Sequence, residues 1–208
     1  MELAENALTT LERLKLALGI SADDVADDDF LILLINSASS WLERQLGRKL
    51  GRNDYEETYQ PSGRQKQLVK NYPITKIYQI DFGRQVIDAS LYVFDDVGLG
   101  EYGIIWKDDG WPYQGYQAGL AYDVVAVSRN LTIKYQAGYV LPKDATPDNP
   151  STLPADLESL IWEMVNVNQQ TAFGSAAGLS AYSISDVSWT FDKTQSTSWV
   201  QRLRGWMR

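Results

Sequence analysis

Hydrophobic positions in the first 50 residues recur with the period of an α-helix. The first stripe comprises Leu11, Leu14 and Leu18, spaced i, i+3 and i+7. This spacing is typical of a helix that buries one face. Thr9, followed three residues later by Glu12, forms a capping-box pair. We therefore expect a short helix with Thr9 as its N-cap.

A second stripe predicts a longer helix from Asp28 to Leu46, with Gly47 as the residue that ends it. Its apolar members are Leu31, Ile35, Ala38, Leu42 and Leu46. Five aspartates lie within residues 23–29, just before this helix. Their spacing does not fit an EF-hand calcium loop. The preferred interpretation is that the helix dipole favours acids at this helix N-terminus.

Between residues 55 and 140 the pattern changes to an alternation with a period of two. The run LTIKYQ at 131–136 places Leu131, Ile133 and Tyr135 on one face of a strand and polar residues on the other. Similar runs are KIYQI at 76–80, LYVF at 91–94, YGIIWK at 102–107 and YDVVAV at 122–127. Because turn-forming residues separate these runs, we expect an antiparallel β-unit of about six or seven strands.

The clearest helical stripe follows a proline-rich connection and occupies residues 154–173. Its apolar members are Leu157, Leu160, Ile161, Met164 and Val165. Pro154 suits the first position of a helix, where its missing amide hydrogen does no harm. The run YSISDVSWTFDK at 182–193 then alternates in two registers with a break at Ser185–Asp186. We expect an interrupted strand there.

These elements predict an α+β fold with a small helical core, an inserted β-unit and an extended C-terminal tail. The core is built from the two N-terminal helices and the helix near 154–173. The expected boundaries are 1–50 and 151–192 for the helical core, 55–140 for the antiparallel β-unit, and 193–208 for the C-terminal docking tail.

Two missing residue types exclude several kinds of chemistry. The chain has no cysteine and no histidine. It therefore contains no disulfide, no thiolate zinc site and no serine–histidine triad. An enzyme would have to rely on carboxylates, Lys, Tyr or an oxygen-bound metal, and no such set stands out. We expect no catalytic residues, no metal, no cofactor and no enzymatic activity.

The formal net charge is −8, which opposes wrapping of nucleic acid because phosphate binding needs a clustered basic surface. It does not oppose a channel through which DNA slides. No apolar run approaches the roughly 20 residues of a membrane helix. The start MELAENALTT has no signal-peptide pattern. We expect no membrane partner.

The last residues, SWVQRLRGWMR at 198–208, carry three arginines and no acid. Trp199, Leu203 and Trp206 follow i, i+4 and i+7, which predicts one apolar helical face. A closing helix packed on its own core would have this pattern. An anchor in a partner's groove would have it too. The polar DKTQSTS before it and the enrichment of Trp and Arg at interface hot spots favour the anchor. The candidate partner-binding residues are Trp199, Arg202, Leu203, Arg204, Trp206 and Arg208.

The many aromatic residues of the β-unit allow a second function. Exposed aromatic rings beside carboxylates bind sugars, and the nearest such patch comprises Asp108, Asp109, Trp111 and Tyr113. A carbohydrate-binding or carbohydrate-acting β-protein of a phage tail or cell surface is therefore the alternative. Sheet propensity and subunit interfaces explain the same aromatic residues.

Three motifs resemble the head–tail connector (adaptor) proteins of tailed bacteriophages. The first is the helix pair LTTLERLKLALGISADDVADDDFLILLINSASSWLERQLGRKL. The second is the strand-to-helix segment LTIKYQAGYVLPKD…LPADLESLIWEMV. The third is YSISDVSWTFDK, with Ser185 where the family usually has glycine. The order and spacing of these motifs are more specific than any one of them, and residues 55–127 exceed the family's compact core.

The resemblance implies a structural protein of the virion neck that forms a ring of about a dozen copies. This ring would dock below the portal protein through its C-terminal tail and continue the DNA channel without sequence-specific binding. Its far face would bind a stopper or tail-completion protein. Before assembly the chain would reside in the host cytoplasm.

Overall fold

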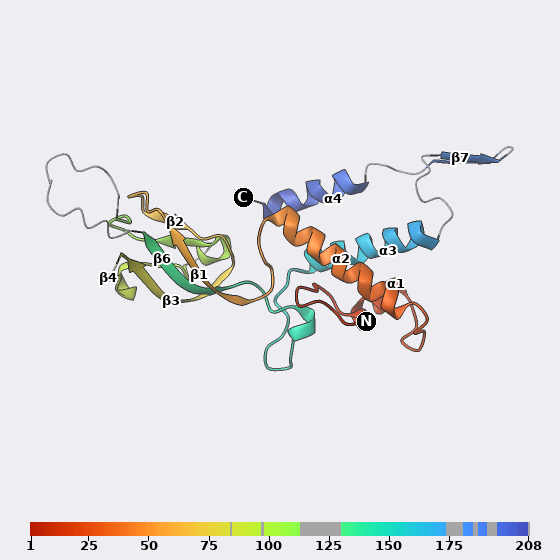
Figure 1. Ribbon diagram of the computed structural model, residues 1–208, viewed down its shortest axis with the longest axis horizontal. Helices are drawn as coiled ribbons and strands as arrows, with labels where there is room; N and C mark the ends of the chain where they lie inside the picture. The colour runs from red at the N-terminus through yellow and green to blue at the C-terminus, as the bar shows by residue number, and fades with distance from the viewer. Residues whose placement is uncertain are drawn as a thin grey trace. The chain divides into compact units, whose positions relative to one another are not determined.

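The chain folds into two units (Figure 1), which the computed structural model describes for residues 1–83, 85–96, 98–112, 130–173, 181–184, 187–190 and 195–207. The helical unit comprises Met1–Arg48 and Val140–Arg208. The β-unit comprises Lys49–Tyr139 and is inserted between these two segments. Helices and antiparallel sheets in one chain confirm the α+β class.

The helical unit contains the three predicted core helices and a helix in the C-terminal segment, where the spacing of Trp199, Leu203 and Trp206 predicts one. Their bounds are α1 at Leu11–Leu18, α2 at Asp28–Leu46, α3 at Ala155–Phe173 and α4 at Gln195–Leu203. Gly47 has φ 65° and ends α2 in the left-handed conformation that glycine tolerates. Two short 3-10 turns, η3 at Pro142–Asp144 and η4 at Arg204–Trp206, belong to the same unit.

The N-cap predicted for α1 is wrong by one residue. Thr10, not Thr9, accepts the backbone N–H of Arg13 at 3.3 Å. Thr9 is fully buried, and its hydroxyl donates to Glu158 Oε1 at 2.8 Å and accepts Trp162 Nε1–H at 2.9 Å. These long-range partners satisfy the buried hydroxyl, and sequence spacing does not reveal them.

The core of the helical unit lies where α2 packs beside α3 (Figure 1). The predicted stripes supply it, because their apolar side chains are buried on both helices except for Leu46, at the end of α2, which is half-buried. The members from α2 are Leu31, Ile35, Ala38 and Leu42, and those from α3 are Leu157, Leu160, Ile161, Met164 and Val165.

The β-unit holds a four-stranded antiparallel sheet in the order β1-β6-β3-β4. These strands are β1 at Asn53–Tyr59, β6 at Leu131–Ala137, β3 at Ile74–Phe82 and β4 at Gln85–Val86. A second, two-stranded sheet pairs β2 at Lys66–Leu68 with β5 at Ile104–Trp106. Two 3-10 turns, η1 at Ala89–Leu91 and η2 at Gly100–Tyr102, connect these strands.

The alternation predicted for β6 is confirmed, since Leu131, Ile133 and Tyr135 are fully buried. The Tyr135 hydroxyl donates to Glu57 Oε2 at 2.6 Å and accepts the backbone N–H of Asn71 at 3.2 Å. Burial and the bond to Glu57 raise the pKa of Tyr135. This polar cluster joins β1 and β6 to the segment before β3.

The motif YQAGY requires glycine after β6. Gly138 has φ 106°, and a Cβ there would lie 2.5 Å from the carbonyl oxygen of Gly51. Only glycine permits this close approach of two backbone segments.

Two of the runs predicted to be strands are not seen as strands in the β-unit. The run LYVF forms only an isolated bridge between Val93 and Trp106, because η1 ends within it. The run YDVVAV lies outside the described residues. Near the C-terminus, β7 at Ala181–Ile184 and β8 at Val187–Thr190 pair antiparallel, with the predicted break between them.

Candidate functional site

The C-terminal segment predicted to bind a partner is described as helix α4 and turn η4. Residues 195–206 are helical, as the spacing of their apolar residues predicts, but they pack against their own unit instead of forming an extended tail. Of the six candidate residues, five lie in this segment, and Arg208 lies outside the described residues.

Two of the predicted anchors face the core of the helical unit. Leu203 is fully buried, and Trp199 is 9% exposed. The Trp199 ring meets Trp41 of α2 edge to face, with centroids 6.2 Å apart and planes at 75°. This arrangement suits the ring quadrupoles. In the free chain these side chains bury their apolar surface against their own helical unit. That they contact a partner stays a prediction.

Two carboxylates on α3 hold the polar atoms of the C-terminal segment. Glu163 Oε1 accepts Trp199 Nε1–H at 3.0 Å, and Glu163 Oε2 pairs with the guanidinium of Arg202. Two helical turns before Glu163 on α3, Asp156 Oδ2 accepts Trp206 Nε1–H at 3.1 Å. The helices therefore run antiparallel, with two acids facing two tryptophans.

These polar contacts lie at the surface. The Glu163 side chain is 46% exposed and that of Arg202 is 44% exposed. Water screens such a pair, so it contributes little to stability. Arg204 is exposed. The outward side of the C-terminal segment is therefore basic, while its inward side is aromatic and aliphatic.

A different carboxylate of α3 fixes the opposite end of the chain. Glu158 is 3% exposed and accepts Arg13 Nε at 2.7 Å, Arg13 Nη2 at 2.6 Å and the Thr9 hydroxyl. The hydrogen bond to Glu158 raises the pKa of the Arg13 guanidinium. Three charge-assisted bonds at one buried carboxylate make this a rigid attachment for α1.

The sequence analysis missed Glu163, Asp156 and Trp41 as partners of the C-terminal segment. A signal for two of them exists in the sequence. Asp156 and Glu163 are seven residues apart on α3, as Trp199 and Trp206 are in the C-terminal segment. Equal spacing of acids and indoles on two helices permits both contacts at once.

The sugar-binding patch is not formed as predicted. Trp111 is 2% exposed, and its indole N–H points inward to the carbonyl oxygens of Gln65, at 2.9 Å, and Ile105, at 3.3 Å. Its ring therefore serves the core of the β-unit and offers no stacking face. Tyr113 lies outside the described residues. Asp108 and Asp109 are exposed and bond to Trp106 and Lys107.

Two searches of the described residues gave negative results. No group of three or more acids could hold a metal ion in that part of the chain. None of its helices is long and apolar enough to cross a bilayer.

Comparisons with known proteins agree with each other. The sequence matches the family model of the head completion proteins over residues 7–146. This range includes α1, α2 and the β-unit. No curated protein matches the sequence.

Among solved structures, the whole chain is similar to a chain described as the neck of an empty GTA particle with C6 symmetry. The TM-score is 0.53, the identity 11% and the coverage of that chain 93%. A neck of a native GTA particle with C12 symmetry gives a TM-score of 0.53 at 10% identity, covering all of this chain and 92% of that chain. A virion of a native gene transfer agent (GTA) particle gives 0.50 at 14%, covering 98% of this chain and 92% of that chain. At these identities the likeness concerns the fold.

Proposed function

Because the chain belongs to the head completion protein family, we propose that it is a structural protein of a virion neck that connects the head of a phage-like particle to its tail. The family match over residues 7–146 is the observation that carries this conclusion. The neck and virion chains with the same fold support it. The role is one of assembly and passage of DNA, without catalysis.

In that role the chain forms a ring of about a dozen copies around the DNA channel. The similar chains come from necks with C6 and C12 symmetry, which supports a ring. The net charge of −8 suits a lumen through which DNA moves without adhering. The far face of the ring receives a stopper or tail-completion protein, and the chain waits in the host cytoplasm before assembly.

The ring docks on the portal protein through α4 and η4. The contacts that hold this segment on its own unit include two buried side chains, Trp199 and Leu203, and hydrogen bonds to Glu163 and Asp156 that are exposed or partly buried. A portal groove that offers carboxylates and apolar surface can replace them one for one. Trp199, Leu203 and Trp206 then fill the groove, and Arg202, Arg204 and Arg208 bind its acids.

Such an exchange has a defined energetic requirement. The portal must bind the released segment more tightly than α2 and α3 do, by a few kcal/mol, for the docked state to dominate. Weak polar contacts between α4 and α3 lower the affinity that the portal must supply. The exposed pair of Glu163 and Arg202 meets that condition.

Two variants test the docking. Truncation after Lys193 removes α4 and η4, and we expect a folded protein that no longer binds the portal. Because truncation also exposes Trp41, the matched variant is Arg202→Glu with Arg204→Glu, which keeps the apolar face of α4. Portal binding, measured by co-sedimentation, is expected to fall sharply in both. Binding that is unchanged in both variants would contradict docking through this segment.

A further inference from the structure

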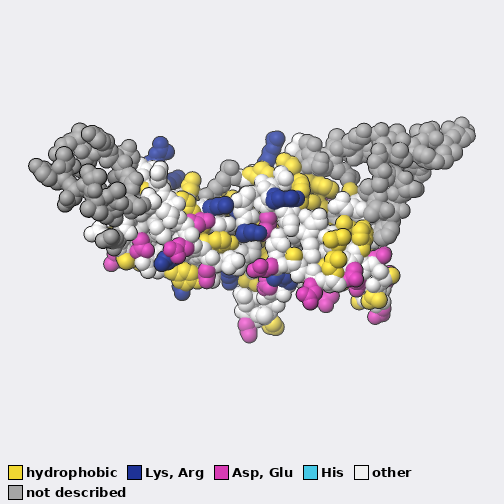
Figure 2. Space-filling model, viewed as in Figure 1, with side chains coloured by type: hydrophobic (Ala, Val, Ile, Leu, Met, Phe, Trp, Pro, Cys, Tyr) yellow, Lys and Arg dark blue, Asp and Glu magenta, His cyan; other side chains and the backbone are white. Residues whose placement is uncertain are grey.

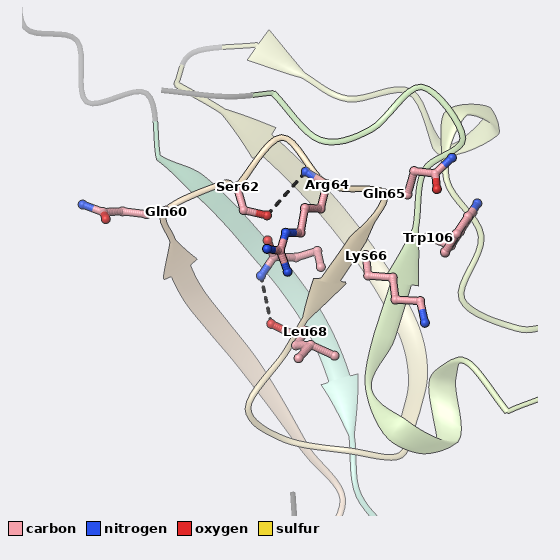
Figure 3. Close-up of a pocket in the computed structure, with 8 residues that line it drawn as sticks. Gln60, Ser62, Arg64, Gln65, Lys66, Leu68 and Trp106 are labelled. Carbon is pink, nitrogen blue, oxygen red and sulfur yellow. Dashed lines mark hydrogen bonds between the residues drawn. The ribbon is translucent and has the colours of Figure 1, made fainter. Parts of the chain in front are cut away.

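A shallow groove in the β-unit has the properties of a protein-binding surface (Figure 3). It encloses about 550 Å³ beside β2, and the loop before β2 forms one wall. Local hydrogen bonds order both elements that line the groove: in the loop, Ser62 Oγ accepts the backbone N–H of Arg64 at 3.4 Å, and on β2, Gln67 Nε2 donates to the Leu68 carbonyl at 2.9 Å. These bonds help to preorganise the groove. The lining residues used below are Arg64, Lys66, Leu68 and Trp106.

The groove carries two cations without acidic partners. Arg64 and Lys66 are both exposed, and neither forms an ion pair within the described part of the chain. The Lys66 ammonium lies 5.9 Å from the centroid of the Trp106 ring, which holds it at the groove. An acidic ligand is what such a pair of cations attracts.

The groove also carries apolar surface. Leu68 is 49% exposed although it lies in a strand, and the half-buried Trp106 lines the same groove. Lys66 and Leu68 are two residues apart on β2 and so project from the same face. A ligand that fits this face combines carboxylates with an aliphatic side chain.

The helical unit presents a segment of that composition. Residues 21–27 are exposed without interruption, and within them Val25 is 68% exposed between Asp23 and Asp27. Figure 2 shows acidic and hydrophobic side chains mixed on this end of the helical unit. A single exposed aliphatic residue is not by itself a binding site, but flanked by two acids it matches the mixed apolar and basic lining of the groove.

This acidic turn has a fixed shape. Lys15 is 5% exposed, donates to the Asp24 carbonyl at 2.7 Å and pairs with Asp28. The backbone N–H of Asp24 donates to the Ser21 carbonyl at 3.1 Å, and that of Ala26 to Asp24 Oδ1 at 3.4 Å. Burying a lysine to hold a surface turn keeps Val25 and its flanking acids in one arrangement, which lowers the entropic cost of binding.

We propose that the acidic turn of one copy docks in the basic groove of the β-unit of the next copy. Val25 packs on Leu68 and Trp106, while Asp23 and Asp27 pair with Arg64 and Lys66. The charge complementarity is local, between the acidic turn and the two cations of the groove, and the groove lies on the less acidic of the two units. The helical unit has 9 basic and 16 acidic residues, hence −7, and the β-unit has 10 and 11, hence −1, which together give −8.

A second copy is the occupant because each chain carries both halves of the contact on different units. Such a heterologous contact leaves one turn and one groove free at the ends of any open chain. It therefore propagates until the rotation closes a ring. The inference rests on the proposed ring and names the contact that forms it.

Cross-linking provides the test, since the chain has no cysteine of its own. A tagged Val25→Cys chain is mixed with an untagged Leu68→Cys chain under oxidising conditions, and tagged–untagged dimers are counted on a non-reducing gel. Mixing separates contacts between copies from contacts within one. The control partner is Val86→Cys, because Val86 is an exposed aliphatic residue of the same unit at 66% exposure. We expect a several-fold higher yield for Leu68→Cys.

Charge reversal then tests the pairing. Asp23→Lys with Asp27→Lys in the tagged chain should lower the yield several-fold, and Arg64→Glu with Lys66→Glu in the untagged chain should restore it. Equal yields for Leu68→Cys and Val86→Cys would overturn the proposal, as would reversal without restoration. The proposal is also overturned if Arg64→Glu with Lys66→Glu abolishes retention of double-stranded DNA and leaves the cross-link unchanged, because nucleic acid is then the occupant.

The cross-linking test of the ring contact is independent of portal docking. A chain with Arg64→Glu and Lys66→Glu retains α4 and should still bind the portal as a single copy. Cross-linking without portal binding would leave the ring contact standing and contradict the docking. Portal binding without cross-linking would leave the docking standing and contradict the ring contact.

Discussion

Helices α1 and α4 are both attached to α3 through a glutamate, but the two attachments differ in burial. Glu158 is almost completely buried and binds Arg13 and Thr9 through three hydrogen bonds. Glu163 is about half exposed and binds Trp199 and Arg202. Truncating one partner of a buried charge network is costly, whereas an exposed pair contributes about 0–1 kcal/mol.

The difference separates a buried attachment from an exposed one, and only the exposed attachment suits the release that we propose. The α1 joint brings together residues about 150 positions apart in the chain and stabilises the helical unit itself. In the proposed docking, the weaker α4 joint would let the last helix rest on the unit in the free protein and leave it when the portal binds it. This comparison is what makes α4, rather than α1, the candidate docking element.

The largest expected effect belongs to Glu158→Ala. This change leaves the buried Thr9 hydroxyl and the Arg13 guanidinium without their carboxylate. We expect the free energy of unfolding to fall by about 3 kcal/mol. Urea unfolding followed by circular dichroism measures it. A loss below that of Glu163→Ala would contradict the distinction between the two joints.

A smaller effect is expected for Leu203→Ala, which truncates a side chain that is fully buried between α4 and its unit. A core leucine usually contributes 2–5 kcal/mol. We expect the free energy of unfolding to fall by about 2 kcal/mol, because α4 detaches instead of leaving a cavity. Hydrogen exchange should accelerate in α4 and remain slow in α2 and α3. Uniform acceleration in all three helices would mean that α4 is an integral part of the core.

The helices were well predicted because their signals are local. The bounds predicted for α2, Asp28 and Leu46, are those observed, since an apolar stripe, acids at the start and Gly47 at the end all agree. The same holds for α3, which ends at Phe173 as expected.

The β-unit was predicted less completely because its strands depend on distant partners. Strand β1 reads NDYEETY, and its half-buried face carries Glu57 between two tyrosines. Hydrogen bonds from Tyr135, Asn71 and the neighbouring Tyr59 make that acid compatible with a sheet, and the first two come from distant parts of the chain. Conversely, LYVF has the composition of a strand but gains only the bridge at Val93.

The candidate site shows the same limit. The spacing of Trp199, Leu203 and Trp206 correctly predicts a helix with one apolar face. It does not say which surface that face meets, because Trp41 lies far away in sequence. The matching seven-residue spacing of Asp156 and Glu163 was the available clue.

The smallest effect on stability is expected for Glu163→Ala. Loss of the exposed pair should lower the free energy of unfolding by no more than about 1 kcal/mol, and added salt should shrink the difference from the unmodified chain. Glu12→Ala is the matched control, because Glu12 is an exposed acid on α1 and the change in net charge is the same.

The affinity of Glu163→Ala for the portal tests the release of α4 most directly. If docking requires α4 to leave α3, weakening the contact between these helices raises the fraction of molecules with α4 released. Binding to the portal then becomes tighter. A change of about 1 kcal/mol corresponds to about fivefold in affinity. Measured by titration against Glu12→Ala, tighter binding of Glu163→Ala is the predicted result. Equal or weaker binding would show that α4 does not exchange partners on docking.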